Sequence, residues 1–124
     1  MTKILVADDS MTARMILKRC LEMIGFKTAV FLEAQDGQEA LEMAEREAPD
    51  LIVADLNMPR MDGESLLRAL KAGPATQAIP VVIASSAVNA VKNERLKALG
   101  SHGIVAKPVS PATLRQALGA LAEI

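Results

Sequence analysis

The chain has 124 residues, of which 51% are hydrophobic and 2% aromatic, and its formal net charge is -1. This length suits one domain with its own core, so we expect residues 1–124 to form a single domain. The near-neutral charge and the absence of Trp and Tyr argue against nucleic acid or an acidic membrane as a partner. Asp8 and Asp9 interrupt the first apolar run and no run reaches membrane-spanning length, so we expect a cytoplasmic protein.

Short apolar runs alternate with helical patterns along the chain. Lys3–Ala7 is apolar and rich in branched side chains, which predicts a strand, and apolar residues at helical spacing follow up to Ile24, with Ser10 as the cap. The single cysteine, Cys20, lies on this helical stripe and is expected to be buried and unreactive. The methionines have no metal-binding spacing and are expected to fill the core and loops. The later strands are expected at 28–34, 51–54, 80–84 and 103–106, and the later helices at 40–48, 66–70, 88–99 and 111–121.

This (βα)5 alternation predicts an α/β fold: a doubly wound parallel sheet with helices on both faces, in three layers. The flavodoxin-like strand order 2-1-3-4-5 is the leading candidate. The runs at 3–7, 51–54 and 80–84 are apolar throughout, as expected for strands covered on both faces. The run at 28–34 contains Glu33 and fits an edge strand better.

Polar residues follow four of the predicted strands. They are Asp8 and Asp9, Asp55, Ser85 and Lys107. The carboxyl ends of parallel strands share one edge of the sheet, which is where ligands bind in open α/β folds. Three ionised carboxylates would repel one another there, and a divalent cation relieves this repulsion. Oxygen ligands without a neighbouring His or Cys favour Mg²⁺. An aspartate pair alone would often be a loop cap, but Asp55 on the next strand weakens that interpretation.

Two interpretations remain open for Lys107 and for Ser85 when each is taken alone. Lys107 could form a plain salt bridge or hold a phosphoryl oxygen, and Ser85 could be a strand-end hydroxyl or a donor to the same anion. Together with the carboxylates and Mg²⁺, they are the parts that phosphoryl transfer needs. Asp55, alone at the end of a central strand, is then best placed as the nucleophile that forms an acyl phosphate.

These residues resemble the receiver domain of bacterial two-component response regulators. The resemblance rests on Asp8-Asp9-Ser10, the stretch DLNMPRMDG at 55–63, Ser85 and Lys107-Pro108, in the right order and spacing over the whole chain. The D-x-x-M-P-x-M-D-G stretch is its most specific part. The run from Asp8 to Arg14 is most similar to single-domain, chemotaxis-type regulators of the CheY kind, and the implied fold is CheY-like.

The resemblance implies that Asp55 accepts a phosphoryl group from a sensor histidine kinase or a phosphotransfer protein. Lys107 would bind a phosphoryl oxygen, and Ser85 would move toward the phosphoryl group and report its presence. The peptide bond between Lys107 and Pro108 would be cis. The protein would assist its own phosphorylation and dephosphorylation without being a turnover enzyme.

The resemblance also implies a set of metal ligands. Mg²⁺, or Mn²⁺ in its place, would be held by Asp9, by Asp55 and by the backbone carbonyl of Asn57, with Asp8 acting mostly through water. Ile104 departs from the family pattern, because many receivers have Tyr or Phe there as a rotameric switch. Without a ring at this position, an aromatic flip is not expected to transmit the signal. The surface of the fourth helix, fifth strand and fifth helix would still bind an output protein.

Other classes of protein fit less well. Haloacid-dehalogenase-type phosphatases place a second Asp two residues after the nucleophile, where this chain has Asn57. A flavodoxin would need a Ser/Thr-rich phosphate loop after the first strand and aromatic residues around the flavin. Phosphorylation-independent receivers usually lack the acidic pair or the lysine, and this chain has both. The alternative that this chain is a receiver domain cut from a larger regulator or hybrid kinase is left open by the sequence.

Overall fold

The computed structural model describes residues 2–123, in which five strands form one parallel sheet in the order β2-β1-β3-β4-β5. The strands are β1 (Lys3–Ala7), β2 (Val30–Ala34), β3 (Leu51–Ala54), β4 (Val81–Ser85) and β5 (Gly103–Ala106). The helices are α1 (Met11–Met23), α2 (Gly37–Glu47), α3 (Gly63–Ala72), α4 (Ala90–Ala98), α5 (Pro111–Leu118) and the short 3-10 helix η1 (Gly119–Glu123). The predicted fold class and strand order are confirmed. Among residues 2–123, no helix is long and apolar enough to cross a bilayer.

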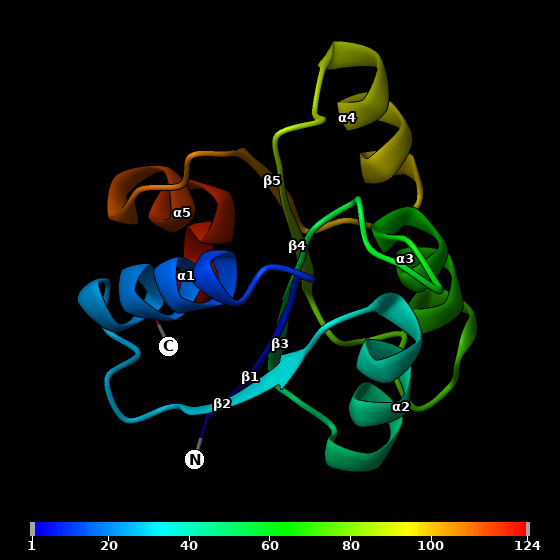
Figure 1. The fold of residues 1–124 in the computed structure, drawn as a ribbon, viewed down its shortest axis with the longest axis horizontal. Coiled ribbons are helices and arrows are strands. Elements are labelled where there is room, and N and C mark those ends of the chain that lie inside the picture. Colours follow the sequence, from blue (N-terminus) through cyan, green and yellow to red (C-terminus); the bar gives the residue numbers. More distant parts are fainter. Residues whose placement is uncertain (1, 124) are drawn as a thin grey trace.

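Helices cover both faces of the sheet, with α1 and α5 on one face and α2, α3 and α4 on the other (Figure 1). Successive strand residues point alternately into the two layers: Ile4 and Val6 pack toward α1 and α5, whereas Leu5 and Ala7 pack toward the other three helices. Because β1, β3 and β4 are covered on both faces, their apolar runs are continuous. The strand β2 lies at an edge, as its mixed sequence predicted.

A polar side chain accepts a backbone N–H at the start of each of the helices α1 to α5. These N-caps are Ser10, Asp36, Asp62, Asn89 and Ser110. Each cap pairs an amide that the helix itself leaves without a partner, which typically stabilises a helix by about 1 kcal/mol. The caps of α2 and α3 place the first turns of these helices close to the edge of the sheet at which the strands end. We call this edge the carboxyl edge.

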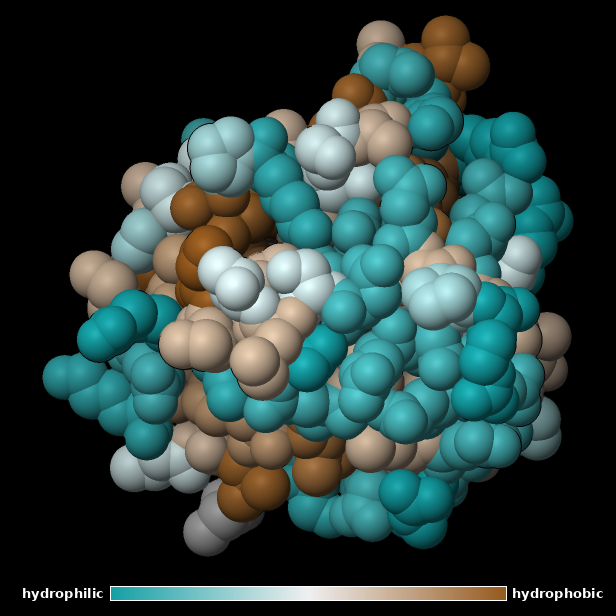
Figure 2. Space-filling view, in the orientation of Figure 1, coloured by the Kyte–Doolittle hydropathy of each residue, from teal (hydrophilic) through white to brown (hydrophobic). Residues whose placement is uncertain are grey.

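Two elements differ from their predicted bounds. The strand β2 begins at Val30, two residues later than the apolar run suggested. The helix α4 begins at Ala90, so that Val88 lies before it, and of its nine residues only Leu96 is buried. Val91 lies five residues before Leu96, about 140° around the helix, and is 79% exposed. The predicted apolar stripe is therefore wrong at Val91, and Figure 2 shows apolar surface at the outer end of α4.

The sulfur-containing residues of α1 divide between its two sides. Cys20 is buried, as predicted, and burial raises the pKa of its thiol. Met11, Met15 and Met23 are instead exposed on the side of the helix that faces away from the sheet. The expectation that methionines fill the core is wrong for these three. Met58, in the loop after β3, is buried as expected.

Gly63 brings the start of α3 against the end of β3. Its N–H donates to the carbonyl of Leu56 at 2.9 Å. A Cβ built on Gly63 would collide with the backbone oxygen of Asp55. Because only a residue without a side chain fits here, this contact sets the backbone position of Asp55.

Replacing Gly63 with Ala should lower the free energy of unfolding by about 1 to 3 kcal/mol, because the added methyl group forces the backbone of α3 away from β3. Urea denaturation followed by circular dichroism measures this loss. Ser65→Ala, at an exposed position in the same helix, is the control and should change stability little. Equal stability of the two variants would contradict the close approach described here.

Candidate functional site

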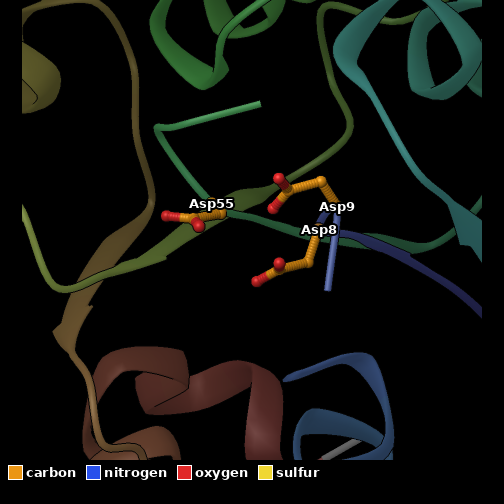
Figure 3. A group of neighbouring side chains, drawn as sticks. All are labelled: Asp8, Asp9 and Asp55. Carbon is orange, nitrogen blue, oxygen red and sulfur yellow. The ribbon is translucent and has the colours of Figure 1, made fainter. Parts of the chain in front are cut away.

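Three carboxylates meet at the carboxyl edge. Asp8 and Asp9 follow β1 and Asp55 follows β3, and one oxygen from each lies within 4.8 Å of the other two. Figure 3 shows the side chains of Asp8 and Asp9 turned to the side on which Asp55 lies. The strands are neighbours in register, Ala7 beside Ala54, so the residues that follow them are brought together. The predicted grouping is confirmed, and we call Asp8, Asp9 and Asp55 the acidic cluster.

Asp8 is held by partners at four of its atoms. Its N–H donates to the carbonyl of Ala34 at 3.0 Å, and its Oδ1 accepts the N–H of Ser10 at 2.9 Å. Its Oδ2 accepts a hydrogen bond from Lys107 Nζ at 2.6 Å, and its backbone oxygen accepts one from Arg14 Nη1 at 2.7 Å. Since the residue is also 1% exposed, both its backbone and its carboxylate are fixed in direction.

Asp55 is held in a similar way at the end of the central strand. Its N–H donates to the carbonyl of Ala7 at 3.0 Å, and its Oδ1 accepts the N–H of Leu56 at 2.7 Å. Its Oδ2 faces Lys107 Nζ at 3.2 Å. The residue is 8% exposed, so its carboxylate can be reached from solvent only at its tip.

Lys107 brings one positive charge to the acidic cluster. It follows β5, its N–H donates to the carbonyl of Ser85 at 3.1 Å, and the peptide bond to Pro108 is cis, as predicted. Burial disfavours the charged amine, but the hydrogen bond to Asp8 and the charges of Asp55 and Asp8 outweigh burial and raise the pKa of Lys107. The amine therefore stays charged at neutral pH. One ammonium does not balance three carboxylates, so the edge attracts a further cation.

The donor atoms at this edge fit a hard divalent cation. The acidic cluster offers carboxylate oxygens alone, and Asn57 lies exposed in the loop that follows Asp55. Within residues 2–123, Cys20 is buried on α1 and His102 precedes β5, so neither is placed to add a nitrogen or sulfur ligand. Oxygen ligands of this kind suit Mg²⁺ or Mn²⁺ better than zinc.

Two further predicted residues, Ser85 and Ile104, lie on the strands β4 and β5. Ser85 ends β4 and is buried, but its Oγ accepts the N–H of Ala87 at 3.1 Å. Among residues 2–123, no hydrogen bond joins that hydroxyl to Asp55 or to the Lys107 amine. Ile104 pairs with Ile83 in the sheet and packs, partly buried, against the core on the α4 side.

The ion pairs of Arg14 were not found by sequence reasoning. Its Nε donates to Glu33 Oε1 at 2.8 Å, and Lys18 Nζ donates to the other carboxylate oxygen at 3.0 Å. These hydrogen bonds, that of Arg14 first, lower the pKa of Glu33 below its ordinary value. A signal was present in the sequence: Arg14 shares the buried face of α1 with Leu17 and Leu21. A charged residue on such a face needs a partner of opposite charge or a hydrogen-bond acceptor.

A second unpredicted contact joins the loop after Asp55 to the start of α2. The N–H of Gly37 donates to the carbonyl of Met61 at 3.0 Å, and a Cβ on Gly37 would collide with that oxygen. Arg60, whose backbone is left-handed at φ 66, pairs with Asp36 at 3.4 Å. The loop is therefore held from two sides, by α2 here and by Gly63 at the start of α3.

A family profile and the similar proteins of known sequence point to the same protein family. A family profile described as "Response regulator receiver domain" matches residues 4–119. Chemotaxis protein CheY-3 of Vibrio cholerae serotype O1 is 34% identical over 121 residues, which cover 98% of this chain and 92% of that protein.

Solved structures agree with this finding. Chemotaxis response regulator CheY4 of Vibrio cholerae superposes with a TM-score of 0.82 at 31% identity, over 95% of this chain and 96% of that one. The signal receiver domain of a DNA binding response regulator from Colwellia psychrerythraea 34H superposes with a TM-score of 0.86 at 30% identity, over 100% of both chains.

Replacing Lys107 with Met should lower the free energy of unfolding by about 3 kcal/mol in metal-free buffer, because the buried carboxylate of Asp8 loses its ammonium partner. Adding Mg²⁺ should recover part of this loss, since a cation at the cluster supplies the missing charge. Urea denaturation with EDTA and with Mg²⁺ measures both effects. Lys97→Met, at an exposed position on α4, is the control, and an equal loss in both variants would contradict the proposed balance of charges.

Proposed function

Because the chain belongs to the response regulator receiver domain family, we propose that it is a CheY-type phosphoacceptor. Asp55 accepts a phosphoryl group from a sensor histidine kinase or a phosphotransfer protein, and the phosphorylated domain changes its binding to an output protein. One observation carries this proposal: a buried carboxylate ends the central strand between an acidic pair and an ammonium, with Lys107 Nζ 3.2 Å from Asp55 Oδ2. We take residues 1–124 to form one receiver domain.

The proposed reaction needs little chemistry from the protein itself. A carboxylate oxygen of Asp55 attacks the phosphorus of a phosphohistidine, and the phosphorus–nitrogen bond breaks with its electron pair staying on the imidazole. Asp55 then carries an acyl phosphate. Lys107 is placed to hold a phosphoryl oxygen, because its ammonium already lies beside Asp55 Oδ2. Positioning and charge neutralisation account for catalysis of this kind. Later attack by water on phosphorus releases inorganic phosphate and restores the carboxylate.

The metal site belongs to the same proposal. Asp9, Asp55 and the backbone carbonyl of Asn57 would hold Mg²⁺ or Mn²⁺ directly, and Asp8 would act through water. Support comes from the donor set, which offers oxygens from three carboxylates within 4.8 Å of one another. The bound cation would supply charge neutralisation for the phosphoryl oxygens. Asp8 would meanwhile keep Lys107 in place through their 2.6 Å contact.

Ser85 would report the phosphoryl group to the output surface. Its hydroxyl would leave the N–H of Ala87 and donate to a phosphoryl oxygen, which moves the loop between β4 and α4. This loop leads into α4, where of nine residues only Leu96 is buried, so little packing opposes a shift. Ile104 packs beside the same region and would change its contacts without a ring flip. The surface of α4, β5 and α5 would then bind the output protein.

Incubation with Mg²⁺ and acetyl phosphate should add one phosphoryl group to the protein, and intact-mass spectrometry measures it. The adduct should be absent from Asp55→Asn, which lacks the nucleophile, and absent when EDTA removes the metal. Asp62→Asn is the control, because Asp62 caps α3 seven residues later and is exposed; it should still be phosphorylated. If the wild-type protein forms no adduct and also fails to bind a beryllofluoride analogue, a phosphorylation-independent binding module is the better description.

A further inference from the structure

Arg14 is a buried cation that no step of the proposed reaction uses. It is 8% exposed, and its Nη1 donates to the backbone oxygen of Asp8 at 2.7 Å. That oxygen belongs to the peptide that joins Asp8 to Asp9. It lies just beyond the end of β1, where the pairing of the strand stops. The guanidinium therefore holds the peptide plane from which both carboxylates extend.

The strand β2 holds Arg14 in turn. Glu33 lies beside Val6 in the sheet register and accepts Arg14 Nε at 2.8 Å. Lys18 occupies its other oxygen at 3.0 Å, and the pKa of Glu33 is lowered, so this partner stays ionised at neutral pH. The planar guanidinium donates to a carbonyl on one side and to a carboxylate on the other. A lysine, which is a point charge on a flexible stem, cannot reproduce this geometry.

We propose that Arg14 is a positioning residue for the metal site, which sets the directions of Asp8 and Asp9 by holding the peptide between them. The inference rests on the proposed function for the identity of the cation. Asp9 is exposed, so few contacts constrain its side chain, and the backbone sets the direction in which its Cα–Cβ bond points. Residues that orient metal ligands in this way typically change metal affinity about 10- to 100-fold when they are replaced.

If only the charge of Arg14 mattered, replacing Arg14 would strengthen metal binding. Arg14 carries a positive charge near the acidic cluster, so removing it would reduce repulsion of a divalent cation and strengthen binding. Positioning predicts that binding weakens. Lys18 is a matched control, because it lies on the same helix and pairs with the same Glu33. The two cations differ in one contact that matters here: Arg14 donates the hydrogen bond to the Asp8 carbonyl, whereas Lys18 donates to Glu33.

The test is the dissociation constant of Mg²⁺ for the unphosphorylated chain, measured by titration of backbone amide NMR signals. Arg14→Met should weaken binding about tenfold, whereas Lys18→Met should leave it unchanged or strengthen it slightly. Arg14→Lys keeps the charge but not the planar fork, and should lie between the wild type and Arg14→Met. The inference is overturned if Arg14→Met binds Mg²⁺ as tightly as Lys18→Met.

Stability is measured in parallel by urea denaturation, because the loss of the buried Arg14 side chain and its hydrogen bonds also destabilises the fold. If Arg14→Met does not fold, Arg14→Lys carries the test, and wild-type affinity in that variant overturns the inference.

Acetyl phosphate labelling of the wild type separates this inference from the proposed function. Labelling together with unchanged Mg²⁺ affinity in the Arg14 variants rejects the inference alone. Weakened affinity without any labelling of the wild type supports the role of Arg14 and rejects the phosphoacceptor. A wild type that binds no Mg²⁺ rejects the inference.

Discussion

Repulsion among three carboxylates at the ends of two adjacent parallel strands dominates the electrostatics of the carboxyl edge. The register of β1 with β3 brings Asp8, Asp9 and Asp55 together, because Asp8 and Asp55 each follow directly from a buried strand and Asp9 is the next residue after Asp8. Lys107 relieves part of the repulsion through its contacts of 2.6 and 3.2 Å. The negative charge that Lys107 leaves unbalanced favours binding of a further cation at this edge.

The backbone around the acidic cluster is held by contacts that tolerate little movement. Arg14 donates a hydrogen bond to the backbone oxygen of Asp8. Gly63, at the start of α3, packs against the carbonyl of Asp55. In the loop that follows, the carbonyl of Met61 accepts the N–H of Gly37. These contacts fix the backbone around Asp8 and Asp55, and precise placement matters for the phosphoryl transfer that we propose at Asp55. Rigid placement of the carboxylates supports the proposed function, which depends mainly on positioning and charge neutralisation.

The helix α4, which follows the loop after Ser85, is packed less tightly against the rest of the fold. Of the nine residues in α4, only Leu96 is buried, and the helix is tied to α3 by an exposed ion pair between Arg95 and Glu64 at 2.6 Å. Surface ion pairs contribute little to stability. Ser85 lies at the boundary, with its carbonyl bound to Lys107 and its hydroxyl bound to the loop before α4. A rigid acidic cluster beside a weakly anchored helix suits the proposed two-state signalling role.

The amino-acid sequence was enough to predict the alternation of strands and helices and the residues of the acidic cluster, and it favoured the observed strand order over the other topologies. These follow from local patterns: apolar runs that end in polar residues, caps such as Ser10 and Ser110, and the rule that parallel strands end at a common edge. Tertiary packing decided what local patterns leave open. The exposure of Val91 depends on which face of α4 packs against the core, and the pairing of Arg14 with Glu33 depends on how α1 packs beside β2. Glu33 is 19 residues from Arg14 along the chain. The two side chains meet because α1 packs beside β2, and residue spacing in the sequence does not predict that packing.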